Sequence, residues 1–396
     1  MPSPRLLVLA AGAFAIGVDG FVIAPILPEL AARLDVPLAA AGQLVTVFTL
    51  VYALAAPVLA TATARWDRRV VLAGTLVVFS AGNALSAIAA DYPLMMASRV
   101  VAALGAALFL PTASATAVTL SPPDRMGRAL ALVMGGLSAA GLVGVPVGTL
   151  LAQAVGASGV FWLVTGVGLA AAAGVAVLLP PVRIPATLTL RERLALAARP
   201  RLAALLATTA LAMAGAFTTI TYIAPLLAEA ADVTGRGLTV VMAVSGLASV
   251  VGVAVAGRAV DARGGRAVLA AAAGVLTAGA LLLPVAGAAV PAAALVFVLG
   301  VAGATVAPAQ QHRLMRAAPE AGTLLLSLNS SAIYLGMSAG GALGGLVVAG
   351  AGASALGAAS AVLYVTALLA TALVRTDAPV PGAERGQEPS RPLSVR

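Results

Sequence analysis

The sequence lacks cysteine and lysine, and His312 is its single histidine among 396 residues. Without cysteine there is no disulfide, no iron–sulfur cluster and no thiol nucleophile, and one histidine cannot build a histidine-rich metal site. No nucleophile motif stands in a suitable context, and no two carboxylates share the centre of an apolar run. The sequence therefore predicts a protein that is not an enzyme and holds no metal or cofactor.

Charge and aromatic side chains are also scarce, at 9% and 4% of residues, whereas hydrophobic residues make up 61%. Soluble domains carry roughly 25% charged residues, so a mean hydropathy of +1.07 indicates a protein built for a lipid bilayer. The formal net charge is +9, and all 23 basic residues are arginines. They stand in short gaps between apolar runs with few aromatic neighbours, which argues against nucleic-acid binding.

About 20 apolar residues cross a bilayer as a helix, and the sequence holds twelve such runs. They cover residues 6–30, 39–64, 70–90, 94–120, 129–152, 159–180, 202–228, 238–257, 267–287, 291–311, 323–349 and 354–374. The first run is too long for a signal peptide and is expected to stay as a helix. Alternate gaps, together with the two chain ends, carry 20 of the 23 arginines. The positive-inside rule then places both termini in the cytoplasm.

The two halves of the sequence resemble each other. "APILPEL" at 24–30 matches "APLLAEA" at 224–230, and "RWDRRVVL" at 65–72 matches "ARGGRAVL" at 262–269. A six-span unit repeated in parallel is typical of transporters made of two bundles. We therefore expect an all-α membrane protein. Its parts are an N-terminal six-helix bundle (1–180), a cytoplasmic central loop (181–201), a C-terminal six-helix bundle (202–374) and a disordered cytoplasmic tail (375–396).

Several segments carry the motifs of one family. The loop between runs 8 and 9 contains Gly257, Asp261, Gly264 and Arg266 at motif spacing, and run 4 has Arg99 in "ASRVVAALGAA". Run 5 contains "GLVGVPVGT", with Gly141, Gly144, Pro146 and Gly148. The loop after run 2 keeps Arg68 and Arg69, but Ala60, Ala64 and Asp67 replace the expected Gly, Asp and Gly.

With these motifs the chain resembles the major facilitator superfamily. Within it, "AGQLVTVFTLVYA" is similar to the twelve-span drug:proton antiporters that include purine, arabinose and chloramphenicol exporters. The resemblance implies twelve transmembrane helices in two bundles, a monomer, and a location in a bacterial cell membrane. It also implies a conformational role for the glycines, Pro146, Asp261 and the loop arginines. Run 5 would pack against the opposite bundle.

One acid stands in the middle of an apolar run. Asp19 lies in an otherwise uncharged stretch from Leu6 to Leu27, where a carboxylate costs about 2.5–3.5 kcal/mol on insertion scales. Burial favours its protonated form, so Asp19 is a candidate for proton coupling, with Arg99 as the partner that pairs with it and releases it. The alternative is a permanent structural ion pair, or an Arg99 that only anchors its helix.

Polar side chains at the centre of the runs are candidates for binding substrate. The candidates are Gln43, Tyr52, Thr112, Thr218, Thr219, Tyr222, Gln310, Gln311, Asn329, Ser330 and Tyr334. A membrane hydroxyl often bonds its own backbone instead. As a set, these residues suit a small amphiphilic molecule, neutral or weakly cationic. The expected function is proton-coupled efflux of drug- or purine-like molecules by alternating access. Uptake of a small neutral solute on the same fold is the alternative, and a receptor or assembly subunit without transport is a third.

Overall fold

A computed structural model describes residues 3–122, 125–182, 198–318 and 322–374 of the chain. The N-terminal half contains α1 (Pro4–Arg33), α2 (Leu38–Ala62), α3 (Arg68–Ile88), α4 (Tyr92–Thr119), α5 (Met126–Ala139), the π-helical turn η2 (Ala140–Gly144), α6 (Val145–Val155) and α7 (Ala157–Leu178). The C-terminal half contains α9 (Pro200–Ile220), α10 (Ile223–Ala231), α11 (Gly235–Leu282), η3 (Leu283–Val285), α12 (Ala289–Ala317), α13 (Gly322–Ala351), η5 (Ala353–Ala355) and α14 (Leu356–Leu373). Most of the predicted central loop (183–197) and the predicted tail (375–396) lie outside the described residues.

The described helices account for twelve membrane crossings. Eleven helical stretches are long and apolar enough to span a bilayer, and one of them, Gly235–Val285, has 51 residues. A straight helix of that length would extend roughly 75 Å, far more than the roughly 30 Å of a bilayer core. Gly264 breaks it with a φ of 76°, a conformation that glycine adopts without strain. This stretch therefore crosses twice, and the predicted all-helical membrane fold is confirmed.

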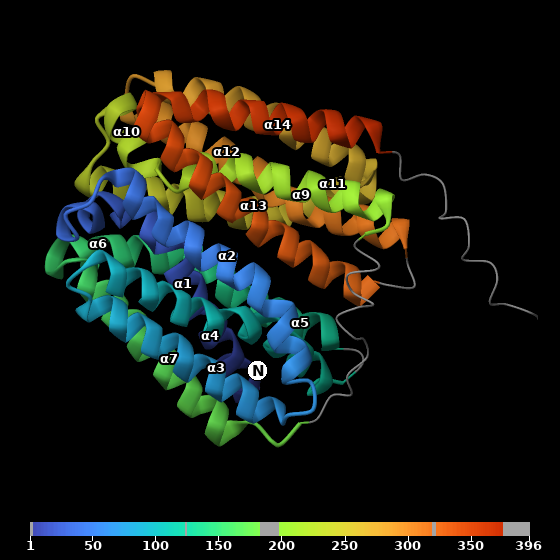
Figure 1. Ribbon diagram of the computed structural model, residues 1–396. Coiled ribbons are helices and arrows are strands. Elements are labelled where there is room, and N and C mark those ends of the chain that lie inside the picture. Colours follow the sequence, from blue (N-terminus) through green and yellow to red (C-terminus); the bar gives the residue numbers. More distant parts are fainter. Residues whose placement is uncertain (1–2, 123–124, 183–197, 319–321, 375–396) are drawn as a thin grey trace, which may run out of the picture.

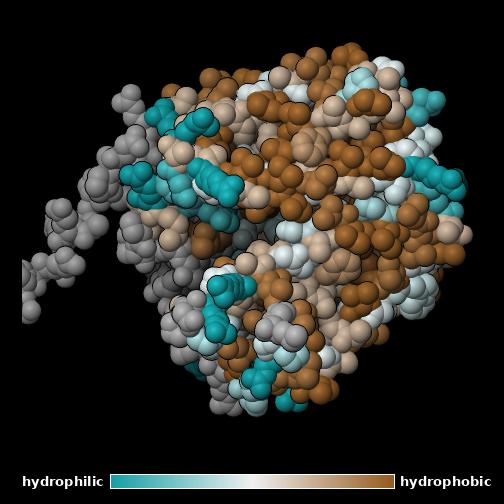
Figure 2. Space-filling model, turned by 180° about the vertical axis from the view of Figure 1, so that it is seen from behind, coloured by the Kyte–Doolittle hydropathy of each residue, from teal (hydrophilic) through white to brown (hydrophobic). Residues whose placement is uncertain are grey.

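The crossings form two bundles that meet at one end. Figure 1 shows α1–α7 below and α9–α14 above, converging near α6 and α10 and separating toward the end where α14 finishes. We call the end that contains the start of α1 and the end of α14 the terminal end, and the other the far end. In the space-filling view the surface is hollowed between the bundles and is largely hydrophobic elsewhere (Figure 2). Large apolar side chains such as Leu54, Val177 and Leu346 are exposed, as expected for helices that face lipid.

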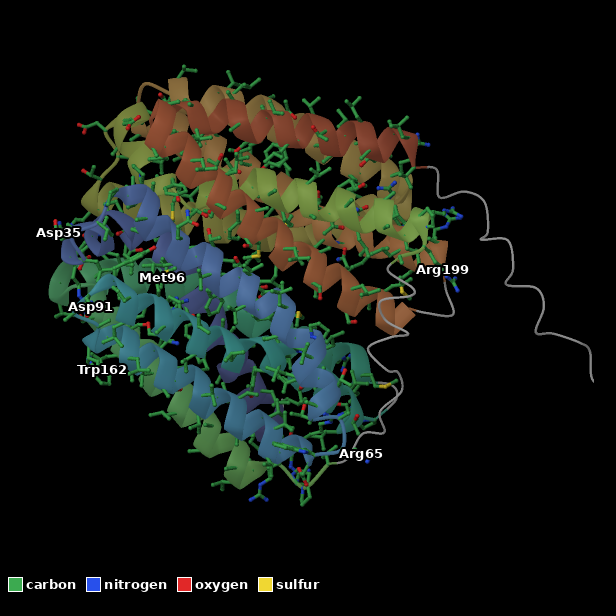
Figure 3. All side chains as sticks on the ribbon, viewed as in Figure 1. Asp35, Arg65, Asp91, Met96, Trp162 and Arg199 are labelled. Carbon is green, nitrogen blue, oxygen red and sulfur yellow. The ribbon has the colours of Figure 1, made fainter. Side chains whose placement is uncertain are left out.

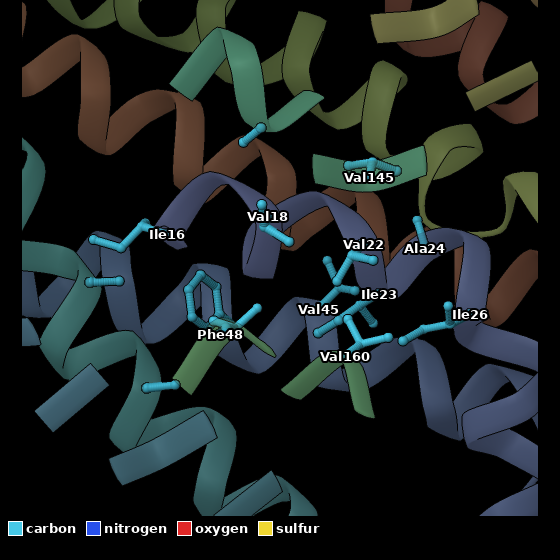
Figure 4. Close-up of a cluster of buried hydrophobic side chains, with 14 of the residues drawn as sticks. Ile16, Val18, Val22, Ile23, Ala24, Ile26, Val45, Phe48, Val145 and Val160 are labelled. Carbon is cyan, nitrogen blue, oxygen red and sulfur yellow. The ribbon is translucent and has the colours of Figure 1, made fainter. Parts of the chain in front are cut away.

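The bundles are held by close helix contacts through small residues. A Cβ at Gly105 would lie 2.6 Å from the Thr75 carbonyl oxygen, so α3 and α4 approach backbone to backbone at this crossing. Such approaches suit lipid, where packing replaces the hydrophobic effect as the driving force. Around α1, the larger aliphatic side chains Val18 and Val22 fill the core together with Phe48 and Val145 (Figure 4).

Two spans are irregular, each beside a proline. Pro146 removes a backbone donor, and η2, which ends at Gly144, absorbs the mismatch with a π-helical turn. In the seventh span Pro225 cannot donate to the carbonyl of Thr221, and the helix breaks between α9 and α10 at Tyr222. Pro146 predicts a kink in span 5, but neither its π-helical form nor the break at Tyr222 was predicted from the sequence.

The glycines of span 5 face a different partner from the one expected. A Cβ at Gly144 would overlap Val18, and one at Gly148 would lie 2.6 Å from Val22 Cγ2. Both glycines therefore pack against α1 of their own bundle, and the expectation that they face the opposite bundle is wrong. Gly141 does meet that bundle, because its carbonyl oxygen lies against the backbone of Gly246 in α11.

Candidate functional site

The candidate site is centred on an ion pair buried in the N-terminal bundle. Asp19 lies near the middle of α1, and Arg99 reaches it from α4. Arg99 Nη1 donates to Asp19 Oδ1 at 2.8 Å and Nη2 to Oδ2 at 2.9 Å, a two-point contact that matches guanidinium to carboxylate. Both residues are completely buried. The sequence left open whether Arg99 pairs with Asp19 or only anchors its helix. In this conformation the two residues are paired.

Three aromatic rings connect this ion pair with the C-terminal bundle. The guanidinium carbon of Arg99 lies 4.5 Å from the centroid of the Phe48 ring, within cation–π range. Phe48 and Tyr52 follow each other on one face of α2, with centroids 6.5 Å apart. Tyr52 stacks on Tyr334 of α13, with centroids 3.6 Å apart and planes inclined by 16°. The row of contacts runs from Asp19 to the boundary between the bundles.

The far end is closed by contacts between the bundles. The Tyr222 hydroxyl donates to the carbonyl of Ala39 in α2 at 3.5 Å and to that of Gly341 in α13 at 3.3 Å. A Cβ at Gly42 would overlap this hydroxyl, and one at Gly345 would lie 2.7 Å from it. The completely buried Tyr222 ring therefore lies in a notch that only glycines leave open.

Two further hydrogen bonds join the bundles on that side of the molecule. Gln153 donates to the Gly235 carbonyl and to Thr239 Oγ1, both at 3.1 Å. Ser338 Oγ donates to the Thr46 carbonyl at 3.2 Å. With the Tyr222 contacts, these bonds fix the closed arrangement of the far end.

Several predicted substrate ligands are turned into the C-terminal bundle instead. Gln310 Nε2 donates to the Leu205 carbonyl at 2.8 Å, and Gln310 Oε1 accepts from Arg313 Nη1 at 2.9 Å. Thr209 Oγ1 donates to Asn329 Oδ1 at 2.8 Å. Gln310 and Asn329 are completely buried in this network. They tie α9, α12 and α13 together, and the expectation that they line a central cavity is wrong for this conformation.

The two predicted threonines of span 7 are also engaged in packing. Thr218 Oγ1 donates to the Ala214 carbonyl at 2.8 Å and to the Gly340 carbonyl at 3.3 Å. Thr219 Oγ1 lies 2.6 Å from Ser360 Oγ of α14, a peripheral helix. Neither side chain is directed at the boundary between the bundles, contrary to the prediction.

The remaining polar candidates occupy mixed positions. Gln43 donates to the Ala39 carbonyl at 3.3 Å beside Tyr222, and Thr112 is buried in α4. Gln311 is exposed, and the exposed Ser330 bonds its own helix at the Leu326 carbonyl. Of the predicted ligands, two pairs are brought together across the bundles, Tyr52 with Tyr334 and Gln43 with Tyr222.

Some residues of the two loop motifs make the contacts that connect neighbouring helices. In the first half Asp67 caps α3, accepting from Arg69 N at 2.8 Å, and Arg68 N donates to the Val182 carbonyl at 2.8 Å. In the second half Gly264 makes the expected turn, while Asp261 is exposed and Arg266 donates to the Ala372 carbonyl at 2.9 Å. The loops thus fasten α3 to the end of α7 and α11 to the end of α14.

Phe48 and Gly246 were missed in the sequence. Phe48 could have been found from its i, i+4 spacing to Tyr52, which places both rings on one helix face. Gly246 carries no such signal, because one glycine among many does not reveal which crossing it permits.

Comparison with known proteins agrees with this fold. The family model of the Major Facilitator Superfamily matches residues 9–325 and 205–395. A chloramphenicol resistance protein of Streptomyces lividans is 34% identical over 344 residues, covering 86% of this chain and 88% of that protein. The inner membrane transport protein YdhP of Escherichia coli K12 is 33% identical over 373 residues, covering 92% and 94%.

Solved structures share the architecture. The human organic anion transporter MFSD10 (TETRAN) superposes with a TM-score of 0.70 at 16% identity, covering 94% of this chain and 100% of that one. A bacterial homologue of the human lysosomal transporter Spinster gives a TM-score of 0.69 at 18% identity, covering 94% and 95%. The chain, with its two bundles of membrane-spanning helices, belongs to the major facilitator superfamily.

Proposed function

We propose that this transporter exports small amphiphilic molecules, drug- or purine-like in character, in exchange for protons. The observation that carries the proposal is the buried pair of Asp19 and Arg99, connected through Phe48 and Tyr52 to a residue of the opposite bundle. The similarity of the chain to a chloramphenicol resistance protein, over most of both chains, supports an export role.

The ion pair provides a way to couple proton binding to a change of conformation. In the present arrangement the carboxyl group of Asp19 is held by Arg99. Removing one partner of a buried ion pair costs about 3–5 kcal/mol, because the other charge loses its compensation. Protonation of Asp19 would remove its charge and release Arg99 to its remaining contact with Phe48. The proton would enter from the far end. It would leave toward the terminal end when the Asp19–Arg99 pair re-forms.

The stacked tyrosines provide the proposed substrate contact. Tyr52 and Tyr334 belong to different bundles and face each other across the boundary. A flat, partly aromatic molecule between the two rings would keep stacking contacts on both faces, worth about 0.5–1.5 kcal/mol for each aromatic pair. Their hydroxyls and the adjoining apolar core favour an amphiphilic ligand over a phosphorylated one.

For orientation, we propose that both termini lie in the cytoplasm. Asp35 and Asp91 lie at the far end and Arg65 and Arg199 at the terminal end (Figure 3). Because arginine is retained on the cytoplasmic side, this distribution supports a cytoplasmic terminal end, and the present conformation would then be open to the cytoplasm. We further propose a monomer in a bacterial cell membrane.

A thiol-labelling experiment tests this orientation. The chain has no cysteine, so Arg199→Cys and Asp35→Cys each introduce one reactive thiol. An impermeant maleimide added to intact cells should label Asp35→Cys and leave Arg199→Cys unlabelled, and cell lysis should make both reactive. Labelling of Arg199→Cys in intact cells would reverse the proposed orientation.

The transport proposal is tested in an exporter-deficient bacterium that expresses the chain. Cells should survive higher concentrations of chloramphenicol or of a toxic purine analogue than cells carrying the empty vector. In everted vesicles, acidification of the lumen should drive uptake of the same compound. Uptake that is independent of the proton gradient would support facilitated solute movement instead. If none of the compounds tested crosses the membrane through the protein, a receptor or assembly role without transport would be supported instead.

A further inference from the structure

Outside the proposed transport site, five basic side chains surround one cavity at the terminal end of the C-terminal bundle. The cavity has a volume of about 470 Å³ and lies between the turn of α11 and the end of α12. Its basic lining residues are Arg263, Arg266, His312, Arg313 and Arg316, and the other lining residues are glycines and alanines. No carboxylate of the described residues lines it. Hydrophilic side chains gather at this end of the molecule in Figure 2.

The turn in α11 brings these arginines together. Gly264 has a φ of 76°, and a Cβ at Gly265 would lie 2.5 Å from the Ala309 carbonyl oxygen of α12. The close approach sets the pair Arg263 and Arg266 opposite the pair Arg313 and Arg316. Arg313 and Arg316 are spaced i, i+3 on α12 and so share a helix face, whereas Arg263 and Arg266 flank the turn at Gly264 and are brought to the cavity by that turn.

The four arginines differ in what they bind. Arg266 Nη2 donates to the Ala372 carbonyl at 2.9 Å, and Arg313 Nη2 to the Val374 carbonyl at 3.0 Å, so both hold the end of α14. Arg263 and Arg316 are exposed and make no hydrogen bond or ion pair with any residue that the structure describes. The Nδ1 atom of His312 is buried without a partner among those residues.

We propose that this cavity binds a phosphate group, supplied by the headgroup of an anionic phospholipid. Guanidinium groups match phosphate oxygens with paired donors, and an anion would relieve the mutual repulsion of the arginines. Basic pockets between membrane helices bind phosphorylated headgroups in this way. The position at the end of the spans places the cavity at headgroup depth. The inference is independent of the proposed transport activity.

The test uses the purified full-length chain in a neutral detergent. Thermal unfolding and native mass spectrometry are recorded with added phosphatidylglycerol, with phosphatidylcholine, and with inorganic phosphate. Phosphatidylglycerol should raise the unfolding temperature and remain bound, whereas phosphatidylcholine should do neither. At about 1 kcal/mol per arginine, the double variant Arg263→Gln/Arg316→Gln should bind phosphatidylglycerol about thirty-fold more weakly.

The matched control is Arg65→Gln/Arg128→Gln, which removes two exposed arginines from the same end of the other bundle. This control should keep the affinity of the parent chain. Equal loss in both double variants, or equal binding of the two lipids, would overturn the proposal in favour of general surface attraction. Competition by inorganic phosphate would support the phosphate site and show that free phosphate also enters it. No effect of inorganic phosphate beside selective lipid binding would assign the site to lipid alone.

Discussion

Asp19→Asn should abolish accumulation of substrate against its gradient while leaving the fold in place. Asparagine keeps the shape of the side chain, but it carries no charge and cannot take up and release a proton as a carboxylate does. One charge that moves across 100 mV releases about 2.3 kcal/mol, which corresponds to an about fifty-fold concentration ratio per proton. In the variant we expect the concentrations of substrate on the two sides of the membrane to become equal. The measurement is uptake of substrate into everted vesicles after a pH jump.

The matched control is Asp35→Asn, the same change at an exposed acid of the far end. Asp35 has a φ of 51°, which asparagine tolerates equally well, so its transport should be that of the parent. Should Asp19→Asn still accumulate substrate at the parent's rate, proton coupling lies elsewhere. Asp19 is then a structural ion held by Arg99.

Gly246→Val should reduce transport strongly by separating the two bundles. A Cβ at this position would meet the Gly141 carbonyl oxygen and would lie 2.6 Å from Leu142 Cα, both in the backbone of η2. Backbone atoms cannot rotate away as a side chain can, and overpacking of this kind costs about 1–3 kcal/mol. The expected result is normal insertion, a lower unfolding temperature and a large loss of transport rate.

Gly274→Val on the same helical stretch is its control, because a Cβ there meets nothing within 4 Å. A third variant, Gly144→Val, separates the two kinds of contact. It should displace α1 at Val18, next to Asp19, and should alter proton coupling through that bundle alone. If Gly246→Val transports as well as Gly274→Val, the contact between η2 and α11 has no part in the transport cycle.

The number and limits of the spans followed directly from the sequence. All twelve apolar runs correspond to helices, and most predicted limits lie within three residues of the observed ones. The runs predicted to end at 257 and 311 continue to the turn at Gly264 and to Ala317. The thickness of the bilayer determines how long a segment must be to cross it, and hydropathy identifies the segments that reach this length. The cost of burying a charge also singled out Asp19, which the structure places in a completely buried ion pair.

The rotation of each helix about its axis could not be predicted in the same way. In a soluble protein the apolar face of a helix identifies the core side, but here lipid and protein interior are equally apolar. Thr219 could thus face either a cavity or a neighbouring helix, and the structure turns it to Ser360. Gln310 was ambiguous for the same reason, because a buried amide needs partners wherever it lies. Pro146 indicates that span 5 is irregular, but the proline alone does not specify the π-helical form of the turn.

The fit of Tyr222 between glycines predicts that the far end of the protein switches between two states, closed and open. A ring that fills a notch shaped for it has no stable half-withdrawn position, because small displacements lose contacts on every side at once. Packed interfaces of this kind switch between discrete arrangements rather than deforming gradually. In the proposed export cycle, a far end that opens in one step would spend almost no time partly open. Under the proposed proton coupling, such a closure would protect the proton gradient from passive leakage, and its fit depends on the absence of side chains at Gly42 and Gly345.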